Sequence, residues 1–131
     1  MRALAGVLLL LTSACTIGPR PGEYAPDATG PHGVFGTLTM RGGDEVRVEL
    51  IEVRDTSLVV LGPEGYALAH FDRIRAVDMP PHYRSSQFSA LRARARLRPA
   101  SRFPHGIPPG VLDELLRSAN QTALTVLAPR R

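Results

Sequence analysis

The sequence has no lysine and no tryptophan, and only one cysteine among its 131 residues. A single cysteine excludes a disulfide bond within the chain. The chain also lacks a glycine-rich phosphate-binding loop, and its serines lack the flanking glycines of a nucleophile elbow. We therefore expect a protein that is not an enzyme and that uses no cofactor.

Long apolar runs are missing as well. The longest, residues 3–14, has about 12 residues, whereas a membrane-spanning helix needs about 20. Arg2 precedes this run, and the small residues 12–14 end it. A positive charge, a short apolar stretch and small residues are the three parts of an export signal, so residues 1–14 are predicted to be a signal peptide.

The sequence Leu11-Thr12-Ser13-Ala14-Cys15 resembles the lipobox of bacterial lipoproteins. The resemblance implies cleavage before Cys15, lipid attachment to its sulfur, and anchoring of the exported protein to the cell envelope. Thr16 follows, where lipoproteins held in the inner membrane often carry aspartate. By the same resemblance, we expect anchoring to the outer membrane of a bacterium with two membranes, facing the periplasm.

Proline and glycine dominate the residues that follow Cys15. Residues 15–33 offer few apolar side chains to a core, so this part is predicted to be a lipidated cysteine and a flexible tether.

Residues 34–79 read as five consecutive strands, over about 35–40, 45–54, 57–61, 66–71 and 74–77. In the second strand, Val46, Val48 and Leu50 point to one face, while Glu45, Arg47 and Glu49 form a solvated outer face. The alternation then slips by one residue at Ile51, which predicts a β-bulge or a sharp bend.

Five short strands with a long bent second strand resemble the Sm-like small β-barrels, with matching stretches at 38–43, 46–55, 58–61 and 71–77. The resemblance implies a closed or nearly closed five-stranded barrel. The RNA-binding signature of that family is not present: Asp55-Thr56-Ser57 replaces its asparagine-containing loop, and Arg75-Ala76 replaces its arginine–glycine pair. We therefore expect no nucleic acid partner.

Residues 80–131 form a basic extension in this prediction. Residues 91–98 alternate strictly between apolar residues and arginine, which suits a strand with an all-arginine face, yet alanine, leucine and arginine also favour a helix. Both alternatives stay open. An apolar stripe at helical spacing predicts one amphipathic helix over about 109–119, and residues 122–127 read as a last strand.

Charge is divided unevenly along the chain. Residues 15–78 contain six arginines and ten acidic residues, whereas residues 79–131 contain nine arginines and two acidic residues. Such a basic part is typical of a solvated face in a chain that uses arginine in place of lysine; the alternative is contact with an anionic lipid or an acidic envelope protein. The candidate contact residues are Arg92, Arg94, Arg96, Arg98 and Arg102.

The sequence gives little support for a catalytic site or a metal site. The histidines, at positions 32, 70, 82 and 105, lack the paired spacing of metal ligands, so no metal site is expected. On a strand, His70 and Asp72 would share one face, so they are the acid–base candidates for a small envelope hydrolase. We favour a mainly β protein with a small α component that acts as a non-catalytic binding or assembly factor.

Overall fold

The computed structural model describes residues 32–81 and 83–128. The predicted signal peptide, the lipidation site Cys15 and the tether up to residue 31 lie outside the described residues. The fold is mainly β with two short α-helices.

The strands form one mixed sheet in the order β6-β5-β1-β2-β3-β4-β7. All neighbouring strands are antiparallel except β4 and β7, which are parallel. The five predicted strands are confirmed, with ends that differ by at most two residues. The strands are β1 (Phe35–Met40), β2 (Glu45–Val53), β3 (Ser57–Gly62), β4 (Gly65–His70), β5 (Ile74–Met79), β6 (Tyr83–Ser85) and β7 (Thr125–Val126).

The predicted closed barrel is wrong, because the sheet is open. Closure of five strands would require the free edges of β4 and β5 to meet. Instead β5 pairs with β6, and β4 pairs with β7. Two strands from the C-terminal extension, which the barrel prediction left out, therefore occupy both edges that would have closed the barrel.

The predicted irregularity in β2 is confirmed. Leu50 pairs with Val60, and Glu52 pairs with Val59, so Ile51 is the extra residue of a bulge. Leu50 and Ile51 are both fully buried, but they belong to different core clusters. Consecutive side chains of a strand point to opposite faces anyway; the bulge shifts this alternation by one residue, so that Val53 and not Glu52 joins Leu50 in the larger core.

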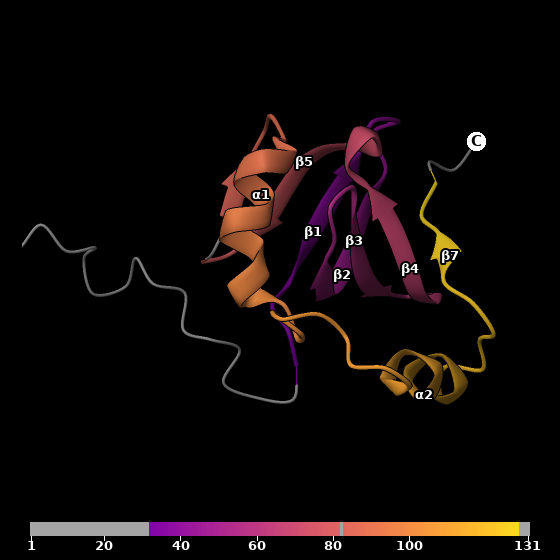
Figure 1. Cartoon of the computed structure of the whole chain (residues 1–131). Coiled ribbons are helices and arrows are strands. Elements are labelled where there is room, and N and C mark those ends of the chain that lie inside the picture. Colours follow the sequence, from indigo (N-terminus) through magenta and orange to yellow (C-terminus); the bar gives the residue numbers. More distant parts are fainter. Residues whose placement is uncertain (1–31, 82, 129–131) are drawn as a thin grey trace, which may run out of the picture.

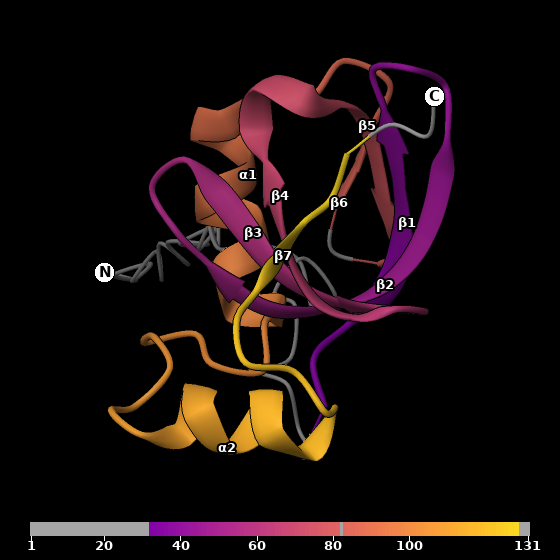
Figure 2. The same cartoon turned by 90° about the vertical axis from the view of Figure 1, so that its right-hand side faces the viewer.

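Each face of the sheet has its own core. The larger core contains α1 (Ala90–Leu97) and the following 3-10 turn η2 (Arg98–Ala100), packed against β1–β5. The smaller core combines Ile51, Val59 and Tyr66 with Leu116 of α2 (Val111–Ser118). A second 3-10 turn, η1 (Phe71–Arg73), connects β4 to β5. Figures 1 and 2 show that α1 and α2 cover different sides of the strands.

The C-terminal helix agrees with its prediction. The predicted span of about 109–119 compares with an observed helix of Val111–Ser118, preceded by Gly110 in the left-handed conformation. Asn120, with φ 55°, ends it as expected of an asparagine after a helix. The predicted strand over 122–127 shortens to β7, Thr125–Val126.

β1 and β5 pack so closely at Gly36 that a larger residue at this position should destabilise the sheet. A Cβ atom on Gly36 would collide with the carbonyl oxygen of Asp78 and would lie 2.8 Å from the Cα of Met79. We expect Gly36→Ala to lower the free energy of unfolding by about 1–3 kcal/mol, measured by urea denaturation. Gly62→Ala is the control, because its nearest neighbours lie 3.7 Å away. Equal losses for both variants would contradict this packing.

Candidate functional site

The helix α1 resolves the ambiguity that the alternating segment left open. Ala93 and Leu97, four residues apart, are completely buried against the sheet. The residues on the opposite side of an α-helix are then Leu91 and Ala95. Both are exposed, and Leu91 keeps 73% of its surface accessible. Burial of a narrow alanine–leucine stripe against the sheet therefore outweighs the alternation that favours a strand.

Arginines flank this exposed ridge on both sides. Arg92 and Arg96 follow one side, and Arg94 and Arg98 follow the other. Arg94 is half-buried, and its Nη1 lies 3.7 Å from Oδ1 of Asp55. Within residues 32–81 and 83–128, the guanidinium groups of Arg92, Arg96 and Arg98 are exposed and form no ion pair. Three of the predicted contact residues are thus available to an anion.

We call this outward side of α1 the arginine face, defined by Leu91, Arg92, Arg94, Ala95, Arg96 and Arg98. Two hollows lie beside it. One, of about 690 Å³, separates Arg94 and Arg98 from Pro104 and His105. The other, of about 590 Å³, lies between α1 and β6. The arginine face is therefore a ridge with a depression on each side.

Arg102, the fifth predicted contact residue, is engaged inside the domain. Its Nε and Nη2 donate hydrogen bonds of 2.9 and 2.8 Å to the two carboxylate oxygens of Glu49. The prediction that Glu49 lies on a solvated strand face is wrong, since its side chain is 2% exposed. The backbone N–H of Gly33 donates a third hydrogen bond, 2.8 Å, to the same carboxylate.

This ion pair lies where the first described residues meet the end of α1. The backbone N–H of Val34 donates to the carbonyl oxygen of Ala100, which ends η2. The backbone N–H groups of Arg102 and Phe103 donate to the carbonyl oxygens of Leu50 and Ile51 in β2. The chain segment that carries Cys15 is therefore covalently joined to the fold beside the C-terminal end of α1.

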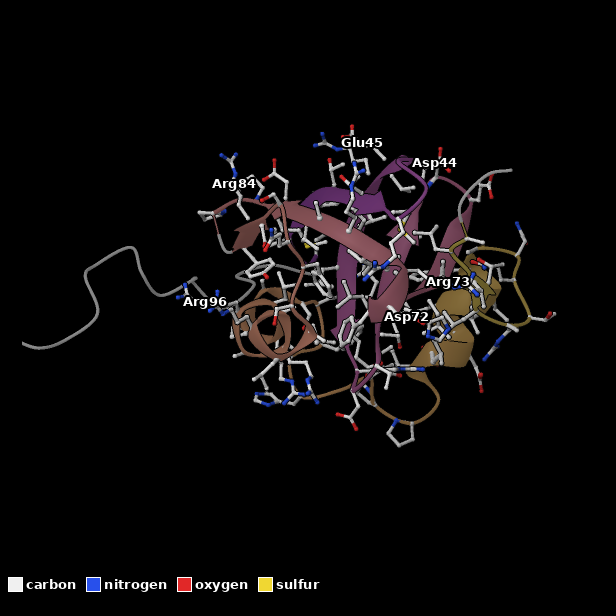
Figure 3. All side chains as sticks on the ribbon, turned by 90° about the horizontal axis from the view of Figure 1, so that it is seen from above. Asp44, Glu45, Asp72, Arg73, Arg84 and Arg96 are labelled. Carbon is white, nitrogen blue, oxygen red and sulfur yellow. The ribbon has the colours of Figure 1, made fainter. Side chains whose placement is uncertain are left out.

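The uneven charge along the sequence becomes a separation in space. Figure 3 shows Arg84 and Arg96 on the side of the molecule that carries α1, whereas Asp44 and Glu45 lie at the turn between β1 and β2. Asp44, Glu45 and Glu64 line one hollow of about 410 Å³ near β7. Arg47 also lines this hollow, so acidic residues are the majority of the charged residues there, whereas arginines are the majority around α1.

His70 and Asp72 line one hollow of about 540 Å³, together with Asp55 and Thr56. The chain positions them at the junction of β4 and η1. No hydrogen bond or ion pair joins the two side chains in the described parts of the chain. A hydrolytic role for this pair stays a prediction.

Metal-ligating groups are not concentrated anywhere in the described structure. Over residues 32–81 and 83–128, no three histidine, cysteine, aspartate or glutamate side chains are placed to hold a metal ion. Within the same residues, no helix has the length and apolar character needed to cross a membrane.

The arginine face has two neighbours that sequence reasoning missed. Tyr83 and Arg84, from the unpredicted strand β6, line the hollow beside Arg92 and Arg96. A three-residue strand has too little periodicity to be detected, so the sequence carried no signal for this placement. The ion pair of Glu49 was also missed, because its partner lies 53 positions away along the chain.

Comparison with known proteins yields no relative. No family model, curated protein or solved structure matches this chain.

Proposed function

We propose that this protein is a lipid-anchored envelope protein, not an enzyme, that lies on an anionic membrane surface through the arginine face. In this proposal Cys15 carries the lipid, residues 16–31 connect it to the domain, and α1 contacts the headgroups of the outer membrane on its periplasmic side. The domain then acts as a membrane-held binding or assembly factor. The observation that carries the proposal is the set of exposed guanidinium groups around Leu91.

The arrangement suits a lipid interface better than a flat acidic protein surface. An exposed leucine at the crest of the helix can enter the boundary between headgroups and acyl chains. Arginine side chains on either side can lay their alkyl stems along that boundary while their guanidinium groups reach phosphates. Arg98 comes immediately after α1, two residues before Ala100, whose carbonyl oxygen accepts a hydrogen bond from the N–H of Val34.

Anchoring and docking support each other in this proposal. The segment that carries Cys15 joins the fold beside the end of α1, so a lipidated chain holds the arginine face near the same bilayer. Basic side chains contribute about 1 kcal/mol each near an anionic surface. A few such groups are then sufficient for docking, because the lipid anchor keeps the local concentration of membrane high.

The anchoring half of the proposal is tested at Cys15. We expect wild-type protein to incorporate a radiolabelled fatty acid and to fractionate with membranes, whereas Cys15→Ser should take up no label and leave the membrane fraction. Incorporation of label by Cys15→Ser, or a wild-type protein that remains soluble and unlabelled, would contradict lipid anchoring.

The docking half is tested with the mature lipidated chain reconstituted into vesicles. Because Cys15 is the only cysteine, Leu91→Cys provides one free thiol for an environment-sensitive fluorophore. We expect its fluorescence to rise when phosphatidylglycerol is added to phosphatidylcholine vesicles. Replacement of Arg92, Arg96 and Arg98 by glutamine should lower the docking equilibrium constant by about two orders of magnitude.

A matched control variant distinguishes docking through the arginine face from a general attraction due to the net charge of the protein. Glutamine at Arg41, Arg47 and Arg73 removes the same charge from exposed positions on other elements. We expect this variant to dock much like the wild type, and raised salt to weaken docking of both. An equal loss in the two triple variants would show that the overall charge, not the arginine face, determines docking.

A further inference from the structure

We propose that the hollow between α1 and β6 is a binding site for a phosphate monoester, supplied by a lipid headgroup. This inference rests on the proposed membrane docking of the arginine face and adds a specific ligand to it. The hollow, of about 590 Å³, is lined by Pro81, Tyr83, Arg84, Arg92, Ala95 and Arg96. We name it the phosphate hollow.

Three arginines from two elements line this one depression. Arg92 and Arg96 come from successive turns of α1, and Arg84 comes from β6. Each guanidinium carries five N–H donors in a planar fork that matches phosphate oxygens. Figure 3 shows Arg84 and Arg96 on the same side of the molecule. A cluster of donors without acceptors is the chemistry that recognises a phosphate group.

One carboxylate, that of Asp78, lies near the hollow and lowers its positive charge. Arg84 Nε donates a 2.7 Å hydrogen bond to Oδ1 of Asp78, and both side chains are well exposed. This contact orients the Arg84 side chain but uses only one of its five N–H groups. Arg92 and Arg96 have no acidic partner in the described part of the chain, so the hollow keeps a net positive charge.

Tyr83 forms part of the wall of the hollow. Its ring is half-buried and meets Phe88 edge-on, with 6.4 Å between the ring centroids. This packing holds β6 against the segment that leads into α1. The distance between Arg84 and the helix is thus maintained by the core rather than by an exposed loop.

The geometry favours a terminal phosphate over a bridging one. A monoester presents three oxygens and close to two negative charges at neutral pH. A diester such as phosphatidylglycerol presents two free oxygens and a single charge, with a glycerol beyond them. A hollow with three forks can bond more of the oxygens of a monoester, since one guanidinium commonly binds two oxygens. The hollow on the other side of the arginine face is lined by two arginines, Arg94 and Arg98, and Arg94 lies 3.7 Å from a carboxylate oxygen of Asp55.

The test uses the lipidated, fluorophore-labelled chain in two kinds of vesicle. Phosphatidylcholine is mixed with phosphatidate or with phosphatidylglycerol, and the compositions are adjusted to equal surface potential. We expect docking about tenfold stronger on phosphatidate. Arg92→Gln should abolish this preference, whereas Arg98→Gln, which removes the same charge from the same helix region, should retain it while weakening docking on both vesicles about fivefold.

The outcomes separate this site from the proposed function. If Arg92→Gln and Arg98→Gln weaken docking equally and neither changes the lipid preference, the phosphate hollow is refuted and the docking proposal stands. If neither variant changes docking, both proposals fail. Soluble glycerol 3-phosphate distinguishes the source of the phosphate: displacement at the concentration of accessible phosphatidate would assign the hollow to a free phosphate and overturn the lipid assignment.

Discussion

Replacement of Arg102 by alanine is expected to lower the free energy of unfolding by about 3–5 kcal/mol. The variant would leave the carboxylate of Glu49, only 2% exposed, without its bidentate partner. The N–H of Gly33 and the largely exposed His32, whose Nδ1 lies 3.8 Å from Oε1, would remain beside this carboxylate. Its two charge-assisted hydrogen bonds would nevertheless be lost, and a buried carboxylate without them carries much of the cost of its lost hydration. For a small domain, whose total stability is about 5–15 kcal/mol, this loss approaches complete unfolding at elevated temperature.

The measurement is urea denaturation followed by circular dichroism, at a temperature where the variant still folds. Arg98→Ala is the control, because its side chain is exposed and unpaired in the described structure; it should change stability by less than about 0.5 kcal/mol. Arg102→Lys should fall between the two, since it keeps the charge but loses the fork. Similar stabilities for Arg102→Ala and Arg98→Ala would refute the structural role of the ion pair.

A second large effect is expected from Leu97→Ala, which should lower the free energy of unfolding by about 2–5 kcal/mol. Leu97 is completely buried in the larger core, and with Ala93 it forms the stripe that holds α1 on the sheet. Truncation removes apolar burial and leaves a cavity that close-packed strands fill only in part. The loss would loosen the element that carries the arginine face.

Leu91→Ala is the matched control, since it makes the same substitution in the same helix at a side chain 73% exposed. We expect its stability to change by less than about 0.5 kcal/mol, whereas its docking to anionic vesicles, followed through vesicle co-sedimentation, should weaken. The two leucines therefore separate folding from membrane contact. Equal stability losses would mean that the buried and exposed sides of α1 are assigned incorrectly.

The sequence predicted that arginines form the candidate site, but it did not predict which arginines lie together. The sequence identified five arginines as one candidate set, because they lie close together along the chain. In the structure Arg102 belongs to an internal ion pair, and Arg84 joins Arg92 and Arg96 instead. Pairing between residues tens of positions apart has no local signature, so pattern analysis could not have sorted these arginines.

The sequence alone determined the elements whose signals are local. Alternation located the five strands, its one-residue slip located the bulge at Ile51, and an apolar stripe located the C-terminal helix. These features follow from the periods of strands and helices, which need only neighbouring residues.

The tertiary structure decided what depends on long-range contacts. Closure or opening of the sheet depended on what occupies its edges, and the extension supplies both β6 and β7 there. The choice of helix for residues 90–97 depended on a sheet face against which Ala93 and Leu97 could be buried. Burial of Glu49 depended on Arg102 reaching it from a distant segment. In each case the free energy that stabilises the observed arrangement comes from contact with a residue far along the chain. The local periodicity of the sequence does not depend on that residue and so cannot predict the contact.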